Sequence, residues 1–176
     1  MKFIETKIRG LYVIELNVLR DDRGMFARTY CKKQFKPIGF DKEFVQMNFS
    51  FNNDKGTLRG MHFQEAPFEE TKLIRCVSGK VFDVAVDLRK DSDTYLQWFG
   101  TELSHDNMKM ILIPGGFAHG FLTLEDNSEL IYHHTEYYNP DAERGLRYND
   151  ETINIQWPAE VKKISDKDKN YPLIKN

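Results

Sequence analysis

Short runs of alternating apolar and polar residues recur along the chain. The clearest run is 44–51, where the odd positions from 45 are Val, Met, Phe and Phe and the even positions from 46 are Gln, Asn and Ser. Such alternation predicts a strand, because successive side chains of a strand point to opposite faces. Further strands are predicted over 11–18, 72–77, 81–88, 110–113, 130–135 and 153–157.

Clusters of turn-forming residues separate these runs. They lie at 21–24, 52–56, 78–79, 114–116 and 139–141. Helix signals are confined to a short segment at 31–38, ended near Pro37 and Gly39, and to a turn or helical cap at 165–168. This rhythm predicts an all-β fold, a sandwich or barrel of antiparallel strands with short peripheral helices.

Composition narrows the class of protein further. Of 176 residues, 40% are hydrophobic and 30% charged, as in ordinary globular proteins, and the length fits one domain over 1–176. The 25 basic residues face 27 acidic ones, which argues against a nucleic-acid partner because such proteins usually carry a basic surplus. No run approaches the ~20 apolar residues of a membrane span. With only two cysteines, we expect a reducing, cytoplasmic setting.

The polar faces of the strands have two explanations. Antiparallel sheets commonly turn one face to solvent, and this is the simpler interpretation of the even positions in 45–51. Alternatively, these side chains line a barrel that holds a ligand. Periodicity alone does not choose between the two.

The five histidines do not form a metal-ligand pattern. A His-x-His pair would place two rings on one face of a strand, but Phe63 and Gln64 follow His62. His133 and His134 are adjacent and therefore face opposite ways. We predict no structural or catalytic metal.

Segment 56–64 carries residues that suit either a ligand or the fold. Gly56 and Gly60 allow the backbone to bend or to approach a ligand. Arg59 offers a bidentate fork for phosphate, although an isolated arginine is more simply a surface residue, and His62 is more simply a structural histidine. Lys72 is equally consistent with an edge-strand lysine. The run 114–121 predicts a tight turn before a strand that carries His119.

Eight sequence motifs, taken in their order along the chain, add further information. They are Asp22-Arg23-Gly24-x-Phe26, Gln46-x-Asn48, 56–64, 72–77, 81–89, 113–121, the pair Tyr132 and Tyr138, and Ser165-Asp166-Lys167-Asp168. Together they resemble, over essentially the whole chain, the dTDP-4-dehydrorhamnose 3,5-epimerase family. The resemblance implies a double-stranded β-helix (cupin jelly roll), a homodimer, and neither metal nor redox cofactor. It also implies inversion of C3 and C5 in a dTDP-linked 4-keto-6-deoxyhexose.

The resemblance also implies catalytic roles. His62 matches the general base, and Asp168 matches the carboxylate that orients it. Tyr132 matches the acid that reprotonates the opposite face. Lys72 matches the cation that stabilises the enolate oxygen.

Substrate-binding roles follow at further matching positions. Besides Lys72, they are Arg23, which reaches the ligand across the dimer, Gln46, Asn48, Arg59, Asp83, His119, Tyr138, which stacks on the base, Glu143 and Lys167. Arg28 is also predicted to bind substrate, but it departs from the pattern, because the family commonly has a carboxylate there. That departure leaves open an epimerase that inverts one carbon or acts on a CDP- or GDP-linked sugar. A nucleotide-sugar-binding cupin without turnover and a metal-dependent cupin oxygenase are two competing hypotheses.

Overall fold

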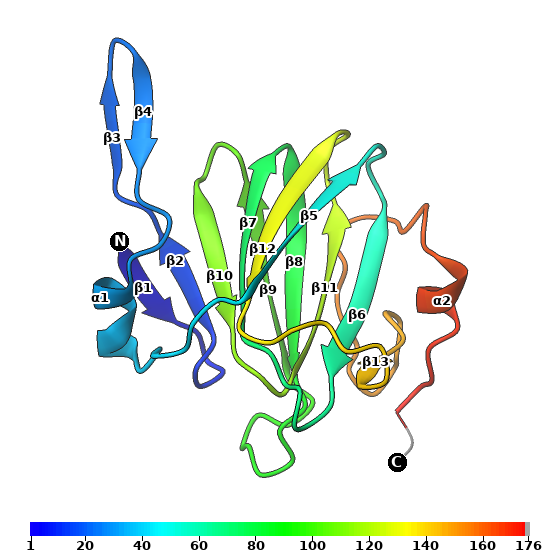
Figure 1. Ribbon diagram of the computed structural model, residues 1–176. Coiled ribbons are helices and arrows are strands. Elements are labelled where there is room, and N and C mark those ends of the chain that lie inside the picture. Colours follow the sequence, from blue (N-terminus) through cyan, green and yellow to red (C-terminus); the bar gives the residue numbers. More distant parts are fainter. Residues whose placement is uncertain (175–176) are drawn as a thin grey trace.

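The chain folds into strands joined by short connections, in a computed structural model that describes residues 1–174 (Figure 1). The last two residues of the predicted 1–176 domain lie outside the described residues. The strands are β1 (Lys2–Glu5), β2 (Tyr12–Glu15), β3 (Val18–Asp21), β4 (Gly24–Ala27), β5 (Gln46–Asn52), β6 (Leu58–Gln64), β7 (Lys72–Ser78), β8 (Lys80–Asp87), β9 (Trp98–Ser104), β10 (Lys109–Ile113), β11 (Phe117–Thr123), β12 (Ser128–His134) and β13 (Glu143–Gly145). The helical segments are α1 (Lys32–Phe35), η1 (Lys36–Ile38) and α2 (Asp166–Lys169).

Two antiparallel sheets form the body of the protein. One has the order β1-β2-β10-β7-β12-β5, and the other has the order β13-β6-β11-β8-β9. Neighbours in these sheets come from distant parts of the chain, as in the pairing of β12 with both β5 and β7. This arrangement is the jelly roll, so the predicted fold class is confirmed.

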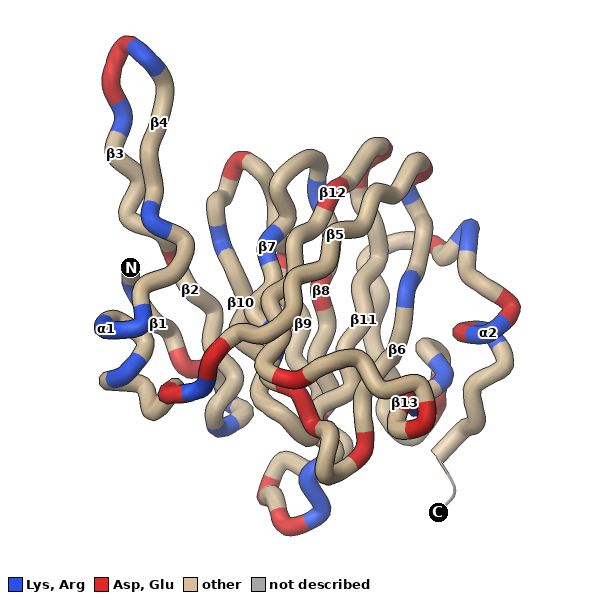
Figure 2. The backbone as a smooth tube through the Cα atoms, in the orientation of Figure 1, with Lys and Arg blue, Asp and Glu red and all other residues tan. Residues whose placement is uncertain are grey.

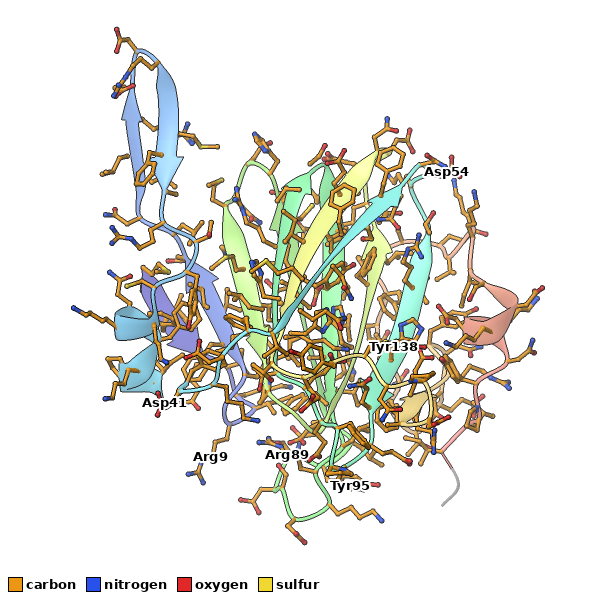
Figure 3. The ribbon with its side chains drawn as sticks, in the orientation of Figure 1. Arg9, Asp41, Asp54, Arg89, Tyr95 and Tyr138 are labelled. Carbon is orange, nitrogen blue, oxygen red and sulfur yellow. The ribbon has the colours of Figure 1, made fainter. Side chains whose placement is uncertain are left out.

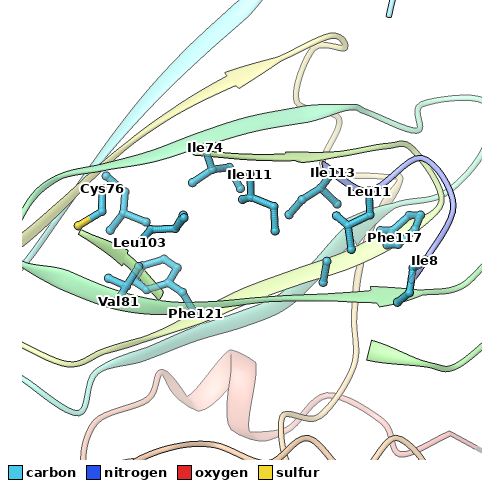
Figure 4. Close-up of a cluster of buried hydrophobic side chains, with 12 residues drawn as sticks. Ile8, Leu11, Ile74, Cys76, Val81, Leu103, Ile111, Ile113, Phe117 and Phe121 are labelled. Carbon is cyan, nitrogen blue, oxygen red and sulfur yellow. The ribbon is translucent and has the colours of Figure 1, made fainter. Parts of the chain in front are cut away.

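The main core lies between the two sheets. Its buried side chains come from both, among them Ile74 and Ile111 from one sheet and Val81 and Phe121 from the other (Figure 4). Their alternation along the strands places the intervening residues on the outer faces. Burial of this apolar surface is the main favourable term that holds the sheets face to face.

The outer faces are covered as well. The segment containing α1 and η1 packs Phe35 and Phe40 on the six-stranded sheet. The C-terminal segment packs Ile153 and Ile155 on the five-stranded sheet. Strands such as β8 are therefore buried on both sides, which explains why residues of both parities along β8 are buried, including Asp83 and Asp87.

Most predicted elements are found, with small shifts of their ends. The runs 44–51, 72–77, 81–88, 110–113 and 130–135 correspond to β5, β7, β8, β10 and β12. Both helical segments are present, and Gly39 ends η1 with a φ of 82°. The run 11–18 is instead divided between β2 and the first residue of β3.

The strand predicted over 153–157 is wrong. Ile153 and Ile155 are buried, but Asn154 between them has a φ of 52°, which no strand accommodates. The side chain of Asp150 accepts hydrogen bonds from the backbone of Thr152 and Ile153 and folds the segment into turns. The alternation of apolar residues here reflects packing against a sheet, because the segment is not itself a strand.

The hairpin β3–β4 stands apart from the two sheets. It projects from the body of the protein, and both signs of charge lie at its tip (Figures 1 and 2). Apolar Leu19, Met25 and Phe26 are nevertheless exposed on it.

A buried carboxylate fixes the loop after β8. Asp87 accepts hydrogen bonds from Arg89 Nε at 2.8 Å, Ser92 Oγ at 2.6 Å and Thr94 Oγ1 at 2.7 Å. Burial raises the pKa of Asp87, but the hydrogen bonds lower it by more, so the net pKa is about 2. A pKa below the ordinary value stabilises the folded state above about pH 4, and the contribution is lost as the pH falls toward 2.

We therefore predict that Asp87→Asn lowers the free energy of unfolding by about 2 kcal/mol at pH 7. The difference from the parent protein should narrow between pH 5 and pH 2, as measured by urea unfolding. Asp91→Asn, an exposed change in the same loop, is the control. A difference that stays constant over this pH range would show that the charge of Asp87 contributes nothing.

Candidate active site

A cavity of about 270 Å³ opens between the two sheets. Its walls come from β5, β7 and β12 of one sheet and from β6 and β11 of the other. The lining side chains are those of Asn48, Phe49, Ser50, Arg59, His62, Lys72, His119, Phe121, Tyr132 and His134. The lining combines polar groups with aromatic rings, as is common where small molecules bind.

His62 lies on β6 and is paired with Asp168 of α2. Its Nε2 is 2.8 Å from Asp168 Oδ1, and the other carboxylate oxygen accepts the Gly60 backbone N–H at 3.0 Å. Burial raises the pKa of Asp168, but the hydrogen bonds from His62 and Gly60 outweigh burial, so its pKa lies below the usual value. An ionised Asp168 accepts the proton on Nε2, which leaves Nδ1 as the basic atom of the ring.

The backbone at Gly60 lets this pair form. Gly60 has a φ of 124°, and a Cβ there would lie 2.6 Å from the Cα of Gly120 on β11. The predicted bend is therefore present, but the close approach is to a neighbouring strand rather than to a ligand. It brings the backbone N–H of Gly60 to Asp168.

Tyr132 lies on β12 with its phenol in the cavity. Its Oη is 2.9 Å from Ser50 Oγ of the neighbouring strand β5. Burial raises the pKa of Tyr132 well above its ordinary value. The phenol therefore keeps its proton at neutral pH and can act as an acid.

Lys72 is not an edge-strand lysine. It lies on β7, which pairs with β10 on one side and β12 on the other. The side chain is 9% exposed, and its Nζ lies 3.0 Å from Glu70 Oε1. A buried ammonium in a polar cavity can stabilise negative charge that develops on a bound ligand.

A second histidine–carboxylate pair lies beside the first, because His119 on β11 is paired with His62 on β6. His119 Nε2 is 2.9 Å from Oδ2 of Asp83, which is fully buried. Burial lowers the pKa of His119, although the charge of Asp83 opposes this. Among the described residues, Oδ1 of Asp83 has no hydrogen-bond partner.

Four of the predicted binding residues form a cluster at the rim. Gln46 Oε1 accepts the Tyr138 backbone N–H at 3.0 Å, and the Tyr138 hydroxyl donates to Glu143 Oε2 at 3.0 Å. Lys167 Nζ donates to the same carboxylate oxygen at 2.6 Å. The ring of Tyr138 stays exposed (Figure 3), so one face of it is free to stack.

Arg23 and Arg28 are not part of this cavity. Arg23 lies at the tip of the β3–β4 hairpin, where its guanidinium bonds to Asp21. Arg28 follows β4 and is exposed. Neither lines the cavity of its own chain.

The sequence prediction did not include three groups in or beside the cavity. Ser50 shares the polar face of β5 with Asn48, and His134 lies two residues after Tyr132 on the same face of β12. Because every second side chain of a strand points to the same face, the sequence could have identified both residues. Glu70 lies outside any strand, and no pattern pointed to it.

Two further structural findings concern the described residues. Over 1–174, no three His, Cys, Asp or Glu side chains are grouped so that they could hold a metal ion. No helix in that part of the chain has the length and apolar character needed to cross a bilayer.

The cavity contains the groups that a proton abstraction needs. It has a base held by a carboxylate, a protonated phenol and a buried ammonium. Together these groups suit removal of a proton next to a carbonyl, with the ammonium close to the developing oxyanion.

Comparisons with known proteins agree with this chemistry. The model of the family described as dTDP-4-dehydrorhamnose 3,5-epimerase matches residues 5–176. A protein of that name from Shigella flexneri is 44% identical over 97% of this chain and 94% of its own. The structure of one from Bacillus anthracis, with TDP and PPi bound, is 44% identical with a TM-score of 0.95, covering 98% of this chain and 99% of that one. A Legionella pneumophila dTDP-6-deoxy-D-glucose-3,5-epimerase, in complex with dTDP-4-keto-L-rhamnose, is 40% identical with a TM-score of 0.93, over 98% and 92% of the two chains.

Proposed function

The chain belongs to the dTDP-4-dehydrorhamnose 3,5-epimerase family and is an isomerase, and we propose that it inverts C3 and C5 of a dTDP-linked 4-keto-6-deoxyhexose. One observation carries the proposal. The His62–Asp168 pair, the Tyr132 phenol and the Lys72 ammonium, brought by four separate elements, meet at one cavity. A protein that only binds a nucleotide sugar needs neither a base nor an acid there.

The first half of the reaction is removal of a proton. The C4 ketone acidifies the hydrogens on C3 and C5, and His62 Nδ1 takes one of them. The electron pair of the broken C–H bond moves to the C4 oxygen, giving an enolate. Lys72 stabilises that negative charge, and Asp168 stabilises the imidazolium that forms.

The second half returns a proton to the other face of the ring. Tyr132 donates its phenolic proton to the same carbon, and the carbonyl forms again. His62 then releases its proton to solvent and the tyrosinate regains one. Each cycle moves protons only, so the proposed reaction requires no hydride acceptor.

The remaining predicted residues suit the nucleotide end of the substrate. Arg59 lines the cavity and is held by a 2.7 Å bond from its Nε to Asn52 Oδ1, which leaves its terminal nitrogens for a diphosphate. The exposed ring of Tyr138 offers a stacking surface for a base at the rim.

Solvent exchange tests the proposed reaction. The protein is incubated in D₂O with dTDP-4-keto-6-deoxyglucose, and the hydrogens on C3 and C5 are followed by NMR. We expect deuterium at both carbons and inversion of both. No exchange at either carbon, with binding shown by calorimetry, would leave only a binding function. Faster exchange on a CDP- or GDP-linked sugar would assign a different carrier.

We also propose that the protein acts as a homodimer. On β5, an edge strand of its sheet, Met47 is 68% and Phe51 46% exposed, and Phe26 on the projecting hairpin is 65% exposed. Exposed apolar groups on an edge strand and a protruding hairpin are typical of a surface that another chain covers. In such a dimer, Arg23 at the hairpin tip would reach the partner's cavity.

Sedimentation tests the dimer. We expect the parent protein to sediment as a dimer at micromolar concentration and a Met47→Asp/Phe51→Asp variant as a monomer, because buried charges oppose association. Tyr95→Asp, on a loop at the far end of the body (Figure 3), is the control. A monomeric parent protein would refute the dimer.

Two remaining expectations are kept as proposals. Cys31 and Cys76 are free thiols, which suits a reducing compartment such as the cytoplasm. Residues 1–176 act as one unit, since the cavity needs both β5 near the start and α2 near the end of the chain.

A further inference from the structure

A buried carboxylate behind the cavity bonds two of its lining residues at once. Glu70 Oε1 lies 3.0 Å from Lys72 Nζ, and Glu70 Oε2 lies 2.5 Å from His134 Nδ1. The three side chains are only 8–11% exposed. Glu70 itself does not line the cavity, so it can act there only through Lys72 and His134.

The contact with His134 continues along the polar face of β5. His134 Nε2 is 3.3 Å from Asn48 Nδ2, and Asn48 Oδ1 accepts from Gln46 Nε2 at 3.2 Å. Gln46 in turn accepts the backbone N–H of Tyr138. A chain of hydrogen bonds therefore runs from Glu70 along the cavity wall to the rim.

The chemistry of these groups fixes which atom donates and which accepts in each hydrogen bond. Burial raises the pKa of Glu70, but the hydrogen bond from His134 and the charge of Lys72 lower it to about 2, so it is ionised at neutral pH. An ionised carboxylate only accepts, hence His134 Nδ1 must donate. In the neutral ring, Nε2 is then an acceptor, which turns the amide nitrogen of Asn48 toward it.

We propose that Glu70 is a positioning residue that holds Lys72 at the keto oxygen and fixes His134 as the Nδ1–H tautomer, which in turn sets the orientation of the Asn48 amide. This inference rests on the proposed function. A lysine side chain has a flexible four-carbon stem, so its ammonium can reach an oxyanion in many conformations. A buried hydrogen bond to its ammonium selects one of these conformations before substrate binds. The side chain therefore loses no further conformational entropy in the reaction step.

Kinetics provide the first test. We expect Glu70→Ala to lower the saturated rate of exchange about thirtyfold, while KM and the affinity for dTDP change less than threefold, because misplacing a stabilising group affects the reaction step. Glu69→Gln, the exposed neighbour, should match the parent protein. A saturated rate within twofold of the parent, or an equally large loss of dTDP affinity, would overturn the proposal.

The tautomer of His134 provides the second test and does not depend on turnover. In ¹⁵N-histidine-labelled protein, His134 should show a protonated Nδ1 and an unprotonated Nε2, and Glu70→Gln should abolish this preference. His134→Phe identifies the signal. If His134 is an Nε2–H tautomer in the parent protein, the proposal fails even when the enzyme is active. If the parent protein has no activity but the tautomer is as expected, the proposed function fails instead.

Discussion

His62→Ala is expected to lower epimerisation at least ~100-fold, because the variant lacks the general base that removes the substrate proton. The affinity for dTDP should stay within about tenfold, or roughly 1.4 kcal/mol, since the residues proposed to bind the nucleotide are left unchanged. Exchange at C3 and C5 should fall together with inversion, because both need the same first step. NMR of the substrate in D₂O measures the two rates, and calorimetry measures the affinity.

A second histidine gives the matched control for this variant. His105 is exposed, and its ring bonds the backbone oxygen of Val77, away from the cavity, so His105→Ala should keep the parent rate. Asp168→Asn should resemble His62→Ala more than the control, because an amide does not hold Nε2–H as a carboxylate does. Unchanged turnover in His62→Ala would mean that another group removes the proton.

Tyr132→Phe is expected to separate exchange from inversion. Without the phenol, the His62 imidazolium exchanges its proton with D₂O and returns a deuteron to the enolate on the face from which the proton was lost. Inversion should therefore fall about 100-fold, while deuterium exchange stays within tenfold of the parent protein. Because the substitution removes one oxygen atom that contacts Ser50 Oγ, the packing of the ring is kept.

Two comparisons make this result interpretable. Tyr95→Phe, outside the cavity, controls for loss of a hydroxyl elsewhere. Ser50→Ala tests the bond that holds the phenol and should reduce inversion less than Tyr132→Phe does. If Tyr132→Phe loses exchange and inversion to the same extent, the phenol takes part in proton removal, and the two-face mechanism is wrong.

Alternation along the chain predicted β5 but not the orientation of its two faces. Asn48 and Ser50 line the cavity, whereas Met47 and Phe51 are exposed. Polar side chains suit solvent and a ligand cavity equally, and apolar ones suit a core and a subunit contact equally. A period of two residues cannot distinguish these cases.

The strand that carries His62 was not predicted. Over β6, Leu58, Gly60 and Met61 are all buried, so apolar and polar positions do not alternate. Its two sides pack on different parts of the protein, which is a property of the fold and not of the local sequence. The strand predicted at 153–157 failed for the converse reason, because burial of Ile153 and Ile155 needs no ladder of backbone hydrogen bonds.

Contacts between residues far apart in sequence limit how much of the site can be predicted from the sequence. His62 and Asp168 are 106 residues apart in sequence and 2.8 Å apart in the structure. Nothing in the spacing of residues alone joined them, and the resemblance to a family supplied the pair. The contact between Glu70 and His134, 64 residues apart, had no such guide, and only the structure joins these two residues.

The central claim is that His62 and Tyr132 act on the same carbon from opposite faces of the sugar ring. A crystal structure with a dTDP-linked hexose bound tests it most directly. The account predicts His62 Nδ1 and Tyr132 Oη about 3–3.5 Å from C3 or C5, one on each face, with Lys72 Nζ at the C4 oxygen. Both side chains on one face of the ring, or either one out of reach of both carbons, would contradict it.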